Sequence, residues 1–239
     1  MRIGFLFAML AGVSLFGQGI PRTADGKPDF SGVWQADGAA SWNILDHRAD
    51  YNSPGGKGVV EGNVLPYQPA AAAKQRENFA HQENDPLSHC LLPGIPRAEY
   101  VSPFKILQTQ KEIVILYEYA HGWRIIPIGG KHPAGRDLES SWLGDSVAAW
   151  DGDTLVIDAT GFNGATWFDM AGNFHSEDLH VVERLKMLDG HTIAYEATIE
   201  DPKVFTKPWK MSFSITGRPD MELQEYECSE AEHTVSSGK

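Results

Sequence analysis

The chain has 239 residues, with 32 acidic against 20 basic side chains and a formal net charge of −12 at pH 7. A surface of this sign repels the phosphates of nucleic acid and the headgroups of anionic lipids, so we expect neither as a partner. The length suits a single domain with a substantial apolar core.

The first 19 residues have the organisation of a cleavable secretory signal peptide. The pair Met1-Arg2 precedes an apolar stretch, Ile3–Phe16, and small residues follow at Gly17 and Gly19. The apolar stretch is shorter than the roughly 20 residues that span a bilayer, which disfavours an uncleaved anchor as the alternative. We therefore expect a mature domain of residues 20–239, not inserted in a membrane and either periplasmic or secreted.

Cys90 and Cys228 are the two cysteines of the chain. An exported protein meets an oxidising compartment, so a disulfide between the C-terminal strand and an upstream loop is the first interpretation. Two independent buried thiols are the alternative. Neither cysteine has the C-x-x-C spacing of a redox or zinc site.

Residues 20–102 are expected to form an irregular and partly helical N-terminal part. Gly, Pro, Asn and Asp are frequent over residues 36–68, which predicts irregular backbone there. One helix is predicted over Pro69–Ala80, because proline suits the first turn and alanine dominates the rest. Asp85-Pro86 would end it.

Residues 103–228 are predicted to form a meander of short strands, preceded by a first strand at Phe30–Trp34. Turn signals such as Asp151-Gly152 and Asp189-Gly190 separate the apolar runs. The expected strands are 104–109, 112–119, 123–128, 146–150, 154–160, 180–188, 192–200, 209–216 and 222–228.

A long antiparallel meander curls until its edges meet, because closure removes exposed edges. We therefore predict an all-β fold, a lipocalin-like (calycin-type) β-barrel with one N-terminal helix and long loops; a β-sandwich is the alternative. The segment Gly32-Val33-Trp34 is similar to the glycine-x-tryptophan that begins many lipocalin-like barrels, which implies that Trp34 fills the closed end. A core tryptophan beside a close backbone approach would explain the segment equally well.

Nearly the whole mature chain resembles a large group of exported bacterial proteins, most of them without an assigned activity. The shared segments are Asp25–Trp34, Cys90 with Pro93-Gly94 and Pro96-Arg97, Arg124 with His132-Pro133, Gly144–Ser146, Trp150 with 152–156, Gly161–Asn163, Trp167, Asp169, His175-Ser176 and 179–184. The resemblance implies export and family membership, and it supplies no reaction.

His132 and His175 are the candidate acid and base, because imidazole titrates near neutrality. A carboxylate such as Asp145 would orient one of them, and we predict Asp145 as the third catalytic residue. The loop 161–176 is long for a compact domain, and such loops are usually functional. Alternatively, both histidines only fix their loops.

Polar and aromatic side chains around the same loops indicate a site for a small organic molecule. The candidate substrate-binding residues are Arg124, Trp150, Asn163, Trp167 and Asp169. At least half of the aromatic rings are expected to fill the core instead.

The chain lacks a P-loop, a dinucleotide fingerprint and a Gly-x-Ser-x-Gly elbow, which disfavours kinases, nicotinamide enzymes and serine hydrolases. No organic cofactor is expected. A divalent metal would use His132, His175 and Glu183, although their spacing matches no strong signature. His180 and Glu183 should face opposite sides of their strand, so they would not both be ligands.

Together these features predict an exported enzyme that performs cofactor-independent acid–base chemistry of the lyase, hydratase or isomerase type. Its expected substrate is a partly apolar, ring-bearing or sugar-like small molecule. The alternative is a non-catalytic exported barrel that binds such a ligand.

Overall fold

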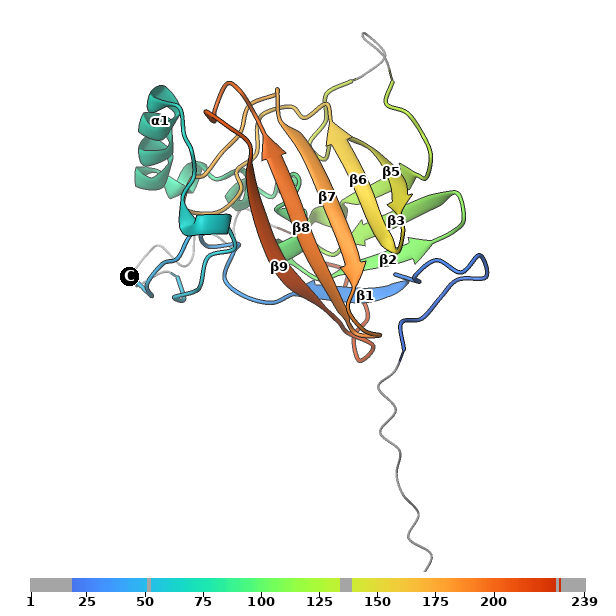
Figure 1. Cartoon of the computed structure of the whole chain (residues 1–239). Coiled ribbons are helices and arrows are strands. Elements are labelled where there is room, and N and C mark those ends of the chain that lie inside the picture. Colours follow the sequence, from blue (N-terminus) through green and yellow to red (C-terminus); the bar gives the residue numbers. More distant parts are fainter. Residues whose placement is uncertain (1–18, 51–52, 134–138, 227, 229–239) are drawn as a thin grey trace, which may run out of the picture.

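The computed structural model describes residues 19–50, 53–133, 139–226 and 228. Over these residues the chain forms one antiparallel sheet of nine strands that curls into a nearly closed barrel (Figure 1). The strand order is β4-β3-β2-β1-β9-β8-β7-β6-β5. The predicted barrel is confirmed, and a single continuous sheet excludes the sandwich.

The strands are short and lie close to their predicted ranges. Their bounds are β1 Gly32–Ala36, β2 Phe104–Gln108, β3 Glu112–Tyr117, β4 Trp123–Pro127, β5 Asp145–Asp151, β6 Thr154–Thr160, β7 His180–Met187, β8 Thr192–Glu200 and β9 Trp209–Gly217. Strand β1 pairs with both β2 and β9, so it joins two meanders, β2–β4 and β5–β9, into one sheet.

The barrel closes along a seam between β4 and β5. Each strand runs antiparallel to its neighbours, and the sheet has an odd number of strands, nine. The two outer strands, β4 and β5, therefore run in the same direction where they meet. A single parallel bridge, Ile128 with Ala148, marks the contact, and the Gly129 N–H donates to the Ala148 carbonyl at 2.7 Å. Because β4 and β5 share no ladder, this seam is the weakest point of the wall.

Side chains alternate between the barrel interior and the outer face, as the pleat of a strand requires. On β8 the inward residues Ile193, Tyr195, Ala197 and Ile199 are all buried. Trp34 is also buried, and its indole Nε1–H donates to the Phe30 carbonyl at 2.8 Å. Trp34 is therefore part of the core.

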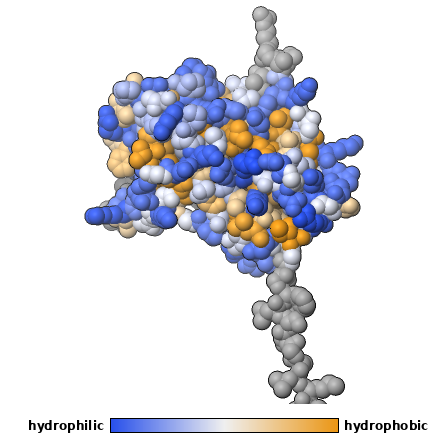
Figure 2. All heavy atoms as spheres, in the orientation of Figure 1, coloured by the Kyte–Doolittle hydropathy of each residue, from blue (hydrophilic) through white to orange (hydrophobic). Residues whose placement is uncertain are grey.

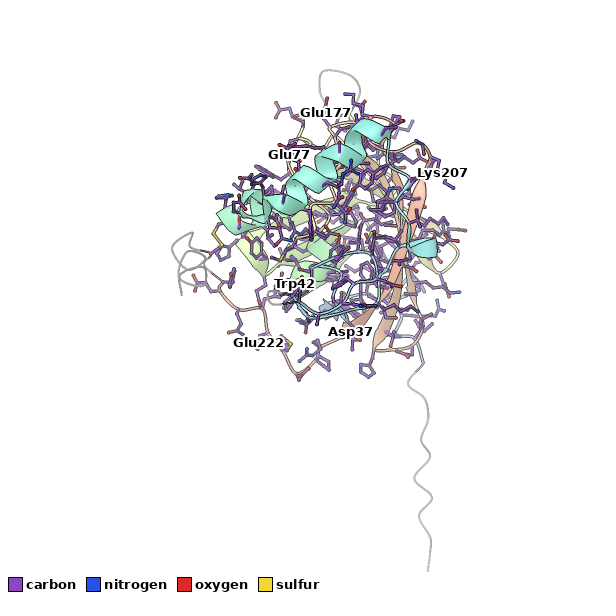
Figure 3. The ribbon with its side chains drawn as sticks, turned by 90° about the vertical axis from the view of Figure 1, so that its left-hand side faces the viewer. Asp37, Trp42, Glu77, Glu177, Lys207 and Glu222 are labelled. Carbon is purple, nitrogen blue, oxygen red and sulfur yellow. A yellow bond between two sulfur atoms is a disulfide. The ribbon has the colours of Figure 1, made fainter. Side chains whose placement is uncertain are left out.

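The helices belong to the N-terminal part, apart from one turn between β3 and β4. Helix α1 covers Pro69–Ala80, as predicted, and lies on one side of the barrel (Figures 1 and 3). Its Asn78 and Gln75 amides donate to the carbonyls of Gly172 and Ala171. A short helix that the sequence did not reveal, α2, covers Ala98–Val101, and single 3₁₀ turns are η1 Glu61–Asn63, η2 Gln82–Asn84, η3 Pro86–His89 and η4 Tyr119–His121.

The predicted strand over residues 222–228 is wrong, because the described part of this segment belongs to no strand. The preceding strand, β9, is already paired on both sides, by β1 and β8, so a further strand has no edge to join there. The segment instead runs past the β3–β4 connection, where the Gln224 N–H donates to Glu118. The predicted disulfide between Cys90 and Cys228 is confirmed.

The surface is largely hydrophilic on the face shown in Figure 2, with smaller apolar patches between the polar side chains. Within the described ranges no helix is long and apolar enough to cross a membrane. The predicted signal peptide lies outside the described residues except for Gly19.

Candidate functional site

A cleft of about 390 Å³ opens at the seam between β4 and β5. Its lining comes from β4, the start of β5, the segments that precede these two strands, and Leu92 of the N-terminal part. The residues are Leu92, Ala120, His121, Gly122, Trp123, Arg124, Ile125, Ser141, Trp142, Leu143, Gly144, Asp145 and Ser146. Two predicted site residues, Arg124 and Asp145, line this cleft. A second cleft of about 360 Å³, between residues 42–53 and the end of α1, contains none of them.

Arg124, which lines the cleft, is the centre of a buried ion-pair cluster that lies behind this lining. Alternation along β4 turns Arg124 inward, and its side chain is 3% exposed. Its Nη2 donates to Glu183 Oε2 at 2.5 Å and to Ser146 Oγ at 2.9 Å, and its Nη1 lies 3.2 Å from Glu99 Oε1. One guanidinium thus faces two carboxylates away from water.

Two tyrosines complete the cluster. The Tyr117 hydroxyl donates to Glu99 Oε1 at 2.6 Å, and the Tyr195 hydroxyl donates to Glu183 Oε1 at 3.0 Å. Burial, with the neighbouring charge of Glu183 as the second cause, raises the pKa of Glu99 to about 7. Glu99 Oε2 and Arg124 Nε have no hydrogen-bond partner among the described residues.

A hydrogen-bonded chain starts at Asp145, which lines the cleft, and runs along the outer face of the barrel. Asp145 Oδ2 lies 2.5 Å from His132 Nδ1, and Asp158 Oδ1 lies 3.0 Å from His132 Nε2. The same Asp158 oxygen is 3.1 Å from His180 Nε2. Asp145 and Asp158 come from β5 and β6, where both occupy outward positions.

A ring that faces a carboxylate at each nitrogen is best satisfied as an imidazolium, which donates at both. Partial burial acts to lower the pKa of His132, but the hydrogen bonds to Asp145 and Asp158 outweigh it and raise that pKa above its usual value. The two carboxylates therefore favour the protonated form of His132, beside the cleft.

His175 occupies a different environment, inside the packed loop that follows β6. Its Nδ1 lies 2.9 Å from the Ser176 carbonyl, which can only accept, so this nitrogen carries the proton. Its Nε2 then accepts from the Thr166 hydroxyl at 2.6 Å. Burial lowers the pKa of His175 and keeps the ring neutral. Within the described residues no hydrogen bond or ion pair joins His175 to His132.

The loop 161–176 begins beside Asp145, which pairs with Thr160, but it then packs on the N-terminal part. Asp169 is buried there, and its carboxylate accepts from the N–H groups of Ile44 and Asn173. Burial raises the pKa of Asp169 to about 6. This carboxylate holds the loop to residues 41–44 and does not line the cleft.

The other predicted binding residues do not line the cleft, although Asn163 contacts a residue that does. The Asn163 N–H donates to the carbonyl of Ser141, which lines the cleft. Trp167 is buried and bridges to Phe174. Trp150, near the far end of β5, stacks on Phe30 with ring centroids 6.1 Å apart.

No group of three or more His, Cys, Asp or Glu side chains is placed to hold a metal ion in the part of the chain that the structure describes. The predicted ligands are separated by the wall of the barrel. Glu183 points inward to Arg124, whereas His132 contacts Asp145 and Asp158 on the outside. The expected opposition of His180 and Glu183 on β7 is confirmed.

Several residues of the cluster were missed from the sequence. The pairing of Glu183 with Arg124 was not predicted, although Glu183 sits between the inward-facing Val181 and Leu185, and a charge at an inward position is the available signal. Glu99 lies on a four-residue helix, which is too short for a helical periodicity to be visible in the sequence. Tyr117 and Tyr195 follow apolar strand patterns and carry no separate signal.

Searches of protein-family models, curated proteins and solved structures found no match to this chain. Membership of the exported bacterial group therefore stays a prediction.

Proposed function

We propose that this protein binds a small, partly apolar, ring-bearing or sugar-like molecule in the seam cleft and transfers protons on it without an organic cofactor. The acid–base pair would be Asp145 and His132. We further propose that it works in the periplasm or the medium. The Cys90–Cys228 disulfide supports this location, because such bonds persist in oxidising compartments.

The observation that carries the proposal is the convergence of Arg124, Asp145 and Ser146 at one cleft. Consecutive residues on β5 point to opposite faces, so Asp145 meets His132 on the outside while Ser146 meets Arg124 on the inside. Both residues border the same space. A bound molecule would thus meet a carboxylate and a hydroxyl next to each other.

Each group has a chemical role in proton transfer. Asp145 would accept a proton from the substrate, and the His132 imidazolium would orient this carboxylate and return a proton. The Ser146 hydroxyl, polarised by Arg124, would donate to an oxygen that gains negative charge. Trp123 and Trp142 would cover the apolar body of the substrate.

A non-catalytic ligand-binding barrel is the second candidate, and a specific observation favours it. Both ring nitrogens of His132 and both terminal nitrogens of Arg124 already contact carboxylates. A substrate would have to displace one of these contacts before His132 or Arg124 could act on it.

The test is a screen of ring-bearing alcohols, ketones and monosaccharides by tryptophan fluorescence, followed by mass spectrometry of bound compounds for turnover. Binding that weakens in Trp142→Leu locates the site. Turnover that falls about 100-fold in Asp145→Asn, with the affinity for these uncharged compounds nearly unchanged, supports the enzyme. Binding without turnover supports the second candidate, and binding that Trp142→Leu leaves unchanged would count against both.

A further inference from the structure

We infer that the cleft selects an organic cation, a protonated or quaternary amine on a small apolar body. This inference rests on the proposed function, because it names the ligand class of the same cleft. It reverses the simplest interpretation of Arg124, in which a buried arginine attracts an anion.

The charge of Arg124 is not available to an anionic ligand. Glu99 and Glu183 both contact its guanidinium from behind the lining of the cleft, so two carboxylates offset this one cation. Glu99 Oε2 also lacks a described hydrogen-bond partner, which leaves an acceptor unused beneath the cleft. An added anion would meet this surplus negative charge in a poorly screened interior.

The side of the cleft at Asp145 also contributes negative charge. Asp145 lines the cleft and, with Asp158, flanks His132, while Asp158 also contacts His180; the groups at and behind the lining are therefore four carboxylates against Arg124 and two imidazoles. Above the pKa of Glu99, about 7, all four carboxylates are charged, and they exceed Arg124 and the two imidazoles by at least one negative charge even if both rings are protonated.

Aromatic surface lies where a cation would enter. Trp123 points outward from β4 and is 61% exposed, and Trp142 lies half-buried in the same lining. The face of an indole attracts a cation within about 6 Å of its centre, most strongly when the cation is an ammonium without tight hydration. Negative charge below and indoles at the rim are the combination that recognises alkylated amines.

The experiment compares three compounds of nearly the same shape and different charge: choline, 3,3-dimethylbutan-1-ol and 3,3-dimethylbutanoate. Binding to the full mature protein is measured by calorimetry and tryptophan fluorescence at about pH 8, above the pKa of Glu99 at about 7, so that Glu99 is ionised. We expect choline to bind at least tenfold more tightly than the alcohol, and the carboxylate to bind least.

Two variants with equal loss of charge locate the effect. Asp145→Asn should lower choline affinity about tenfold and leave the alcohol unchanged, while circular dichroism verifies the fold. Glu77→Gln is the matched control, since Glu77 is exposed on α1 and does not line the cleft (Figure 3), and it should change neither. If the alcohol or the carboxylate binds as tightly as choline or more tightly, the inference is overturned, but the cleft is still a ligand-binding site. Absence of binding by all three also overturns it, whereas the proposed function fails only if the neutral ring compounds fail as well.

Discussion

Arg124 on β4 and Glu183 on β7 meet inside the barrel, with Nη2 and Oε2 2.5 Å apart and both side chains almost fully buried. Removing one partner of a buried pair leaves an uncompensated charge, which costs about 3–5 kcal/mol. We expect Arg124→Met to lower the free energy of unfolding by about that amount in urea denaturation.

Arg184 provides the matched control on the same strand as Glu183. Its guanidinium contacts Asp151 at 2.7 Å, but both side chains are exposed. Exposed pairs contribute about 0–1 kcal/mol, so Arg184→Met should have little effect. Equal losses in the two variants would contradict the buried cluster.

Glu99 should make stability depend on pH in a defined direction. Burial, with the Glu183 charge second, raises its pKa from 4.5 to about 7 in the folded protein. The folded chain then holds this proton more tightly than the unfolded chain does, so the contribution is complete below about pH 4.5 and is lost as the pH rises through about 7. Glu99→Gln cannot ionise and should remove this fall in stability.

Asp169 also makes stability depend on pH, so the effect of Glu99 must be measured as the difference between two proteins. Burial raises its pKa to about 6, so it acts in the same direction as Glu99 over an overlapping range. The measure is therefore the difference between the parent protein and Glu99→Gln in urea midpoints between pH 5 and 8. Parallel profiles would show that Glu99 ionises normally.

The barrel was predictable because its strands follow local rules. The alternation and Asp-Gly turns that predicted 154–160 and 192–200 also determine β6 and β8, whose bounds agree. Residues 222–228 have only partial alternation, because two polar residues separate Leu223 from Tyr226, and they have no free strand edge to pair with. The lack of an edge is a property of the topology and not of the segment.

The site was only partly predictable, for a different reason. His132 and Asp145 lie on segments that are neighbours in the sequence, and the polar residues of these segments indicate that the two side chains could meet. The pairing of Arg124 with Glu99 depends on how a short helix enters the barrel, which no local pattern fixes. His175 was linked to His132 by loop length alone, and its contacts lie within its own loop.

The disulfide should stabilise the barrel although Cys228 lies outside every strand. The bond closes a sequence separation of 138 residues, which restricts the unfolded chain strongly. We expect Cys90→Ser with Cys228→Ser to lower the free energy of unfolding by about 2–4 kcal/mol. Reductant should lower the urea midpoint of the parent protein and leave that of the double variant unchanged; a shift in both would show that another process is responsible.

The two histidines should titrate differently, and NMR of the imidazole nitrogens can follow both in one sample. His132, with its pKa raised by Asp145 and Asp158 against the effect of burial, should be protonated on both nitrogens at pH 6.5, the usual midpoint for histidine. His175, with its pKa lowered by burial, should be neutral there and protonated on Nδ1 alone.

Asp145→Asn separates the two environments. Loss of the carboxylate removes one of the contacts that favour the imidazolium, so the pKa of His132 should fall towards its usual value while the His175 signals stay in place. Because the extra proton on His132 stabilises the folded state at low pH, this variant should also lose stability mainly below pH 6.5 and little at higher pH. A His175 that charges in the same range as His132, or that shifts in Asp145→Asn, would instead indicate that the two rings are coupled, as an acid and base acting together on one substrate would be.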